Sequence, residues 1–240
     1  MFDNINIVLV NTSHPGNIGS SARAMGVMGL SNLSLVNPKD YPSEVAEAMA
    51  VGCSDILDNA KVYEKLTEAL QDKMINVAFS ARSRKEAIPS IKIDECINMI
   101  HDNPEHTYNV IFGNEKSGLS NDELLLCDKL VTLPTSEFYS SLNLSAAVQI
   151  FSYELLKKSL GHRIDSDEKK DLIFLAKTKD REFFYQKLIN LLESTGYIHE
   201  KSKQSLIKKI HIIFNKAKLE THELSILNGI LASIEKKINT

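Results

Sequence analysis

The sequence INIVLV at residues 5–10, followed by NTSHPGNIG at residues 11–19, decides how the chain is expected to fold. The first six residues are apolar enough to form a strand that is buried on both faces, as in sheets covered by helices. The turn-rich residues that follow lead into a helical pattern at residues 20–28. A buried strand, a polar loop and a helix are the beginning of a βα repeat, so the N-terminal part predicts an α/β domain.

The same alternation continues to about residue 160. Further strands are predicted at residues 33–36, 75–79, 108–112 and 130–133, and helices at residues 43–51, 91–100, just after Asn121, and 142–160. Strands that alternate with helices favour a mostly parallel sheet. In such sheets ligands bind beyond the carboxyl ends of the strands, and the polar loops of this sequence all follow strands.

The last third of the chain has a different character. A polar stretch at residues 161–166 is interpreted as a linker, and residues 167–240 contain three amphipathic helical stretches, which predict a small helical bundle. We expect Leu206, Ile210 and Ile213 to face its core. The net charge is −3 for the whole chain, but residues 1–160 are acidic and residues 161–240 are basic. This asymmetry indicates two domains, of which residues 167–240 are suited to a polyanion.

Several classes of protein are disfavoured by the composition. No apolar run approaches the roughly 20 residues that a membrane-spanning helix needs, and the N-terminus lacks the features of a signal peptide, so we expect a cytoplasmic protein. The three cysteines, Cys53, Cys96 and Cys127, are far apart and form no CxxC pair. We therefore expect neither a disulfide nor a bound metal.

Three polar segments could carry chemistry, although each alone is a weak signal. Segment one, residues 11–24, contains PGNIG, which is neither a GxGxxG nor a Walker A sequence and could be only a tight turn. Segment two, residues 112–119, reads FGNEKSGL, and its two glycines allow close approach of a ligand to the backbone. Segment three, residues 133–148, begins LPT and contains SSLNLSAAV, where a serine could simply cap a helix.

Taken together and in this order, the three segments resemble the motifs of the SpoU part of the SPOUT superfamily of RNA 2′-O-methyltransferases. The helical C-terminal extension, with ELSILNGILASIE at residues 223–235, narrows the resemblance to the TrmJ branch. The resemblance covers nearly the whole chain. It implies an α/β fold with a deep trefoil knot, S-adenosylmethionine as cofactor, and a homodimer whose active sites are built from both chains. It also implies a tRNA substrate, methylated on the ribose of cytidine or uridine 32 in the anticodon loop.

The resemblance assigns roles to individual residues. Arg23 matches the catalytic arginine, with Asn17, Glu115, Ser141 and Asn143 near the reaction. Positions that match cofactor contacts are Phe79, Ser80, Ala81, Gly113, Leu133, Ser140, Ser141 and Leu142. A guanidinium stays protonated in proteins, so a role for Arg23 in clamping phosphate and stabilising the developing alkoxide is more conservative than a role as base. Pro15 departs from the small residues usual at its position and should stiffen the loop.

RNA contacts are expected from basic residues in both domains. Six lysines fall within residues 201–218 without an acidic residue between them, although such a run is more often only a solvated helix face. The candidates are Arg23, Arg82, Arg84, Lys201, Lys203, Lys208, Lys209, Lys216 and Lys218.

Three alternative interpretations were weighed. A nucleotide-binding oxidoreductase is disfavoured, because no acidic residue ends a strand about 20 residues after the first glycine-containing loop, where a ribose contact would be expected. A non-catalytic RNA-binding relative is disfavoured by the intact set of candidate catalytic residues. The third alternative is a methyltransferase that acts on another tRNA position or on ribosomal RNA. The motifs of residues 1–160 do not distinguish these substrates, and only the C-terminal resemblance does.

Overall fold

The computed structural model describes residues 1–81, 88–139, 141–161, 175–199 and 203–238. Four predicted site residues lie outside these ranges: Arg82, Arg84, Ser140 and Lys201. The predicted linker, residues 161–166, lies outside them except for Gly161.

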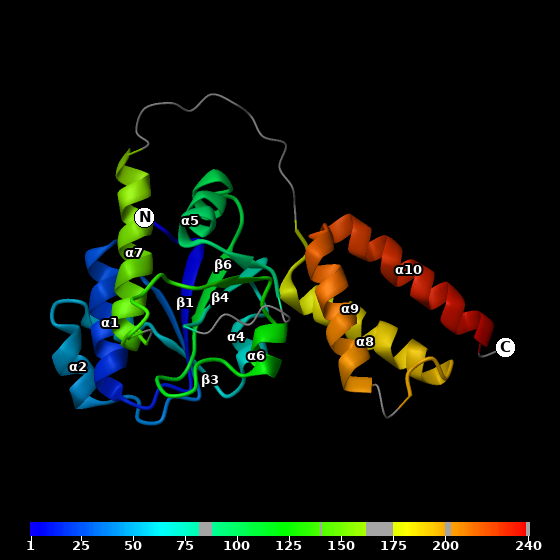
Figure 1. Cartoon of the computed structure of the whole chain (residues 1–240), viewed down its shortest axis with the longest axis horizontal. Helices are drawn as coiled ribbons and strands as arrows, with labels where there is room; N and C mark the ends of the chain where they lie inside the picture. The colour runs from blue at the N-terminus through cyan, green and yellow to red at the C-terminus, as the bar shows by residue number, and fades with distance from the viewer. Residues whose placement is uncertain (82–87, 140, 162–174, 200–202, 239–240) are drawn as a thin grey trace.

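A single parallel sheet of seven strands, in the order β3-β2-β1-β6-β4-β7-β5, forms the centre of the N-terminal domain (Figure 1). The strands are β1 (Ile5–Val10), β2 (Asn32–Val36), β3 (Lys61–Tyr63), β4 (Ile75–Phe79), β5 (Ser90–Ile91), β6 (Tyr108–Phe112) and β7 (Lys129–Val131). All residues of β1, β4 and β6 are buried, because helices cover both faces of the sheet. The predicted α/β class with a parallel sheet is confirmed.

Helices cover the two faces unequally. The helices of this domain are α1 (Pro15–Val27), α2 (Glu44–Ala50), α3 (Ser54–Asp58), α4 (Leu66–Ala69), α5 (Ile93–Asp102), α6 (Asn121–Leu125) and α7 (Leu144–Gly161). The larger apolar cluster joins one face of the sheet to α1, α2, α3, α5 and α7, and a smaller cluster joins the other face to α4 and α6. Figure 1 shows α1 and α7 side by side on one flank and α4 and α6 on the other.

Some boundaries differ from the prediction for identifiable reasons. Helix α1 begins at Pro15, five residues before the predicted start, because proline is well suited to the first helical position, where no backbone donor is needed. Part of the expected loop is therefore the first turn of a helix. The short strands β3 and β5 and the short helices α3 and α4 were not predicted, since two to five residues carry too little periodicity.

The C-terminal part consists of α8 (Thr178–Ser194), α9 (Lys203–Ala217) and α10 (Thr221–Ile238), which we call the helical domain. It has its own apolar core, which includes Phe184, Leu191, Ile210, Leu224 and Leu231. The predicted bundle is thus confirmed, but the expectation for Ile213 is wrong: its side chain is 62% exposed, on the outer face of α9. In the described parts of the chain, no helix is both long and apolar enough to cross a membrane.

Candidate active site

A cavity of about 320 Å³ opens at the carboxyl ends of β4 and β6, where segments two and three meet. Its lining includes seven residues that the sequence resemblance assigned to cofactor contacts: Phe79, Ser80, Ala81, Gly113, Leu133, Ser141 and Leu142. Sequence reasoning did not single out Phe112, Asn114, Thr135, Leu144 and Ala147, which also line the cavity. The structure therefore brings together residues that lie far apart along the chain.

The cavity has an apolar wall and a polar side. The rings of Phe79 and Phe112 stack with their centroids 4.8 Å apart. The ring of Phe151 packs edge-on against Phe79, with a distance of 5.4 Å between the ring centroids. Glu115, Lys116 and Ser117 also line the cavity and contribute polar groups and the hairpin backbone of segment two. Small-molecule sites are commonly cavities of roughly 300–1,000 Å³ that combine apolar walls with a few fixed polar groups.

Segment two owes its shape to two glycines. An antiparallel bridge joins Asn114 to Gly118, and Gly118 has a φ of +67°, which glycine adopts without strain. A Cβ atom on Gly113 would lie 2.3 Å from the carbonyl carbon of Gly118 and 2.4 Å from the nitrogen of Leu119. Glycine at position 113 therefore allows the hairpin to close against the end of β6.

Glu115 holds segment one against segment two. One carboxylate oxygen accepts hydrogen bonds from the backbone nitrogen of Ser13 at 3.0 Å and from its hydroxyl at 2.8 Å. The other accepts from the backbone nitrogen of His14 at 3.2 Å and from Nδ2 of Asn17 at 2.8 Å. Sequence reasoning missed Ser13, whose only signal was its place in a polar loop after a strand.

Asn17 connects segment one to segment three through a further hydrogen bond. Its Nδ2 donates to Glu115, so its Oδ1 is left as an acceptor and receives a 3.0 Å hydrogen bond from Nδ2 of Asn143. The Oδ1 of Asn143 accepts in turn from the backbone nitrogen and the hydroxyl of Ser145, at the start of α7. A carboxylate can only accept, and this fixes the orientation of both amides along the chain of hydrogen bonds.

The charge of Glu115 follows from these partners. Burial opposes ionisation of its carboxyl, but the hydrogen bonds from Asn17 and Ser13 outweigh that effect and lower its pKa from 4.5 to about 2. A carboxylate with so low a pKa is a poor proton acceptor near neutral pH, because an efficient general base has a pKa near the working pH. Its geometry suits it to hold the loops in place.

Arg23 is not part of this cluster within one chain. It lies on α1, is exposed, and does not line the cavity. Arg23 follows Asn17 by six residues, which is about one and two-thirds helical turns, so the two side chains leave α1 on different faces. Within a single chain, the catalytic role assigned to Arg23 and the role assigned to Asn17 near the reaction are therefore separated in space.

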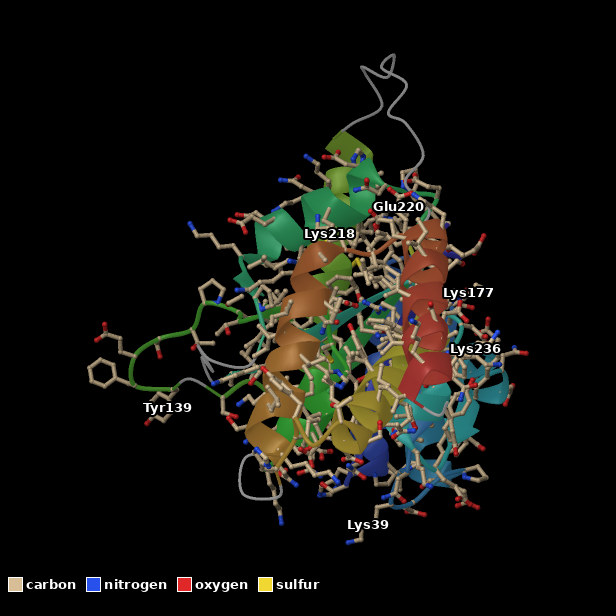
Figure 2. The ribbon with its side chains drawn as sticks, turned by 90° about the vertical axis from the view of Figure 1, so that its right-hand side faces the viewer. Lys39, Tyr139, Lys177, Lys218, Glu220 and Lys236 are labelled. Carbon is tan, nitrogen blue, oxygen red and sulfur yellow. The ribbon has the colours of Figure 1, made fainter. Side chains whose placement is uncertain are left out.

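The described candidate lysines for RNA contact in the C-terminal part lie on α9 or just beyond it, but they are not equivalent. Lys209, Lys216 and Lys218 are exposed, whereas Lys208 is half-buried. Lys203 forms an ion pair with Glu193 at 2.7 Å, so its charge is partly neutralised. Figure 2 shows Lys218 at the end of α9, well separated from Tyr139 on the protruding loop of segment three.

No cluster of three or more histidine, cysteine or acidic side chains that could bind a metal occurs among the described residues. The three cysteines are free thiols, and burial raises the pKa of Cys96 to about 12.

The fold and the site assign the protein to the methyltransferases. Residues 4–153 match the model of the SpoU rRNA Methylase family, and the chain belongs to this family. It is therefore an S-adenosylmethionine-dependent methyltransferase with a mostly parallel α/β fold. The cavity is compatible with this cofactor, because it offers an apolar wall for a base and a hairpin backbone for polar groups.

The C-terminal part and the full-length relatives narrow the class. Residues 179–240 match the model of the C-terminal domain of the tRNA methyltransferase TrmJ. A tRNA (cytidine/uridine-2′-O-)-methyltransferase TrmJ from Sodalis glossinidius is 43% identical over 98% of this chain and 92% of its own length. The crystal structure of TrmJ from Z. mobilis superposes with a TM-score of 0.85 at 28% identity, covering 96% of this chain and 98% of the other. A methylase family protein from Haemophilus influenzae is 38% identical, with a TM-score of 0.66 and coverage of 100% and 99%.

Proposed function

We propose that this enzyme methylates the ribose 2′-hydroxyl of cytidine or uridine at position 32 of tRNA, in the cytoplasm. The observation that carries the proposal is the hydrogen-bonded chain from Glu115 through Asn17 to Asn143 at the mouth of the cofactor cavity. It joins the three segments on which the family resemblance rests. The relatives that span the whole chain, including the C-terminal domain, are named as tRNA cytidine and uridine 2′-O-methyltransferases.

The reaction places modest demands on the protein. S-adenosylmethionine, when bound, would supply a methyl group on a sulfonium, whose sulfur leaves as a neutral thioether because the carbon–sulfur bond breaks while the ribose oxygen forms its bond to the methyl carbon. The enzyme must align the hydroxyl with that methyl group, and the proton that the hydroxyl loses passes to solvent water, because neither the Glu115 carboxylate nor the protonated Arg23 guanidinium is suited to accept it. Ser141 lines the cavity, and Asn143 lies two residues further along segment three; we assign both to orienting the ribose. Glu115 and Asn17 keep that part of the site in position.

Arg23 takes part through a second copy of the chain. The exposed side of α1 carries Arg23 and, one turn later, Val27, and the adjoining α7 exposes Ile150 and Tyr153. We assign this partly apolar surface to a homodimer interface, so that Arg23 of one protomer serves the cavity of its partner. There the guanidinium binds the phosphate next to the target nucleotide and stabilises the developing alkoxide.

The two domains have different tasks in this proposal. Residues 1–160 bind the cofactor and carry out the transfer, and residues 167–240, after a linker at residues 161–166, bind the tRNA. The exposed Lys209, Lys216 and Lys218 supply phosphate contacts in the helical domain. Contacts from Arg82, Arg84 and Lys201 belong to the same proposal.

A methyl-transfer assay tests the proposal directly. The purified protein would be incubated with labelled S-adenosylmethionine and unmodified tRNA transcripts, and the product digested to locate the label. We expect label on the 2′-oxygen of nucleotide 32, and none in a transcript whose nucleotide 32 already carries that methyl group. Label at another position, or transfer only to ribosomal RNA, would disprove the substrate assignment and keep the enzyme class.

A further inference from the structure

A chain of buried hydrogen bonds crosses the sheet and ends on the helical domain. The Ser34 hydroxyl donates to Oδ1 of Asn6 at 3.1 Å, and Nδ2 of Asn6 donates to Oδ1 of Asn109 at 2.8 Å. Asn109 donates to Asn76 at 2.9 Å, and Nδ2 of Asn76 donates to Oγ1 of Thr178 at 2.9 Å. Thr178 is the first residue of α8, so the helical domain completes a polar network that begins inside the other domain.

An ion pair lies beside this contact. Both terminal nitrogens of Arg181, on α8, donate to the two carboxylate oxygens of Asp128, just before β7, and each side chain is 11% exposed. Oδ2 of Asp128 also accepts from the backbone nitrogen of Asn76 at 2.8 Å, and Arg181 donates to the carbonyl of Met74 at 3.2 Å. A bidentate pair of this kind has a defined geometry, in contrast to apolar contacts, which are not directional.

A third contact involves α9, the helix that carries the exposed lysines. Asn215 donates from Nδ2 to the carbonyl of Cys127 at 3.3 Å and accepts from the hydroxyl of Tyr185 at 2.7 Å. Its neighbour along the chain is Lys216. The hydrogen bond to Cys127 places the end of α9 beside the start of β7, where burial and the nearby charge of Lys218 lower the pKa of Lys129. Figure 1 shows α9 on the side of the helical domain that faces the sheet.

The three contacts lie at the amino ends of β4 and β7, whereas the cofactor cavity lies at the carboxyl ends of β4 and β6. Helix α9 also packs against α6, which follows segment two of the cavity within a few residues. The helical domain is thus attached at the amino ends of the strands. It extends beside the sheet toward the carboxyl ends, where the cavity lies.

We propose, on the basis of the function assigned above, that Asp128, Arg181, Thr178 and Asn215 form a docking clamp that fixes the orientation of the helical domain, so that the α9 lysines and the cavity engage one tRNA simultaneously. Thr178, Arg181 and Asn215 are positioning residues, since none of them touches the cavity. If Arg181 is removed, Asp128 is left buried without its partner, which disfavours the docked arrangement. Two sites held in fixed relation bind one ligand more tightly than the same sites joined loosely.

The test compares two clamp variants with a matched control in the full-length protein. Arg181→Met removes the ion pair, and the gentler Thr178→Val removes the contact with Asn76. Lys187→Met is the control, because Lys187 also lies on α8 but forms its 3.3 Å ion pair with Glu235 inside the helical domain. With unmodified tRNA we expect the KM of both clamp variants to rise about tenfold, with kcat within about twofold and unchanged cofactor affinity. The control should match the wild type.

Two further measurements separate positioning from stability alone. An isolated anticodon stem-loop lacks the remainder of the tRNA that the proposal assigns to the α9 lysines, so wild type and Arg181→Met should methylate it with the same KM. The double variant Asp128→Arg with Arg181→Asp, which restores an ion pair in reverse, should recover part of the tRNA affinity. A KM for full-length tRNA that stays unchanged in folded Arg181→Met and Thr178→Val proteins would overturn the proposal.

Domain orientation can be measured without any activity. Spin labels at Glu64→Cys and Lys237→Cys, in a Cys53→Ser background and diluted with unlabelled protein, report the distance between the two domains of one chain. We expect one narrow distance distribution for the wild type and for Lys187→Met, and a broad one for Arg181→Met. An equally narrow distribution in Arg181→Met would overturn the clamp. If the wild-type protein methylates no tRNA but Arg181→Met still broadens the distance distribution relative to the wild type, the proposed function fails and the clamp stands.

Discussion

Nδ2 of Asn17 donates a 2.8 Å hydrogen bond to the carboxylate of Glu115, 98 residues further along the chain. The same carboxylate oxygen accepts from the backbone nitrogen of His14, and the other accepts from Ser13. One ionised side chain thus positions the beginning of α1 against the hairpin that lines the cavity. Asn17 in turn accepts a hydrogen bond from Nδ2 of Asn143, which connects Glu115 to segment three.

This relationship predicts a pH dependence that Glu115→Gln should remove. The folded protein lowers the pKa of Glu115 from 4.5 to about 2, so the ionised form stabilises the fold. That stabilisation is complete above pH 4.5 and is lost as the pH falls toward 2. We therefore expect the difference in free energy of unfolding between wild type and Glu115→Gln to narrow over this range. Urea unfolding at a series of pH values measures it.

The same substitution should weaken the cofactor site at neutral pH. A glutamine has one acceptor oxygen and presents an amide donor to backbone donors, so we expect about a tenfold loss of S-adenosylmethionine affinity, measured by calorimetry. Glu137→Gln, on the exposed part of segment three, is the control and should bind normally. Wild-type affinity in Glu115→Gln would mean that the loops hold together without this charge.

A further prediction concerns the hairpin of segment two. Gly113→Ala would place a Cβ atom 2.3 Å from the backbone of Gly118, so the hairpin must open. We expect cofactor binding to be lost, or weakened at least about a hundredfold, in a protein that still folds. Gly229→Ala is the opposite control: Gly229 is an exposed helical glycine with nothing within 4 Å of its added Cβ, and alanine there should stabilise α10 by up to about 1 kcal/mol. Calorimetry and thermal unfolding distinguish the two effects.

The sequence allowed much of the fold to be predicted, for physical reasons that particular residues illustrate. Residues 5–10 and 108–112 are apolar runs with one asparagine each, bounded by turn signals, and these become central strands. Asn17 and Glu115 could be assigned to a site because their segments follow a pattern, but their partner Ser13 carries no such signal. Asp128 and Arg181 could not be paired, since nothing local to either residue encodes a contact between elements 53 residues apart. Ile213 was wrongly placed in a core because helical periodicity does not say which face the rest of the chain covers.

Arg23 allows the shared active site to be tested by mixing two inactive variants. Arg23→Ala should lose methyl transfer by at least about a hundredfold while it binds the cofactor normally, because the guanidinium acts on the acceptor side. Asn143→Ala should also be nearly inactive. If Arg23 serves the cavity of the partner, co-refolded protein should recover roughly a quarter of wild-type activity, because half of the dimers are mixed and each has one intact site. Mixtures that stay inactive would place Arg23 and Asn143 at the same site of one chain.

The lysines of α9 predict how salt affects tRNA binding. Each phosphate contact contributes about 0.9 to the slope of log affinity against log salt concentration for a duplex, and about 0.7 for a single strand. Lys209→Ala with Lys216→Ala should therefore flatten that slope by roughly 1.4–1.8 and weaken binding at low salt, equally for different tRNA sequences. Lys237→Ala, at the far end of the helical domain on α10, is the matched control and should keep the wild-type slope. Filter-binding titrations between 50 and 200 mM salt measure the change over a range in which such contacts have a large effect. An unchanged slope in the double variant would move the phosphate contacts from α9 to the α/β domain, and then Arg23 would be the first residue to test by the same titration.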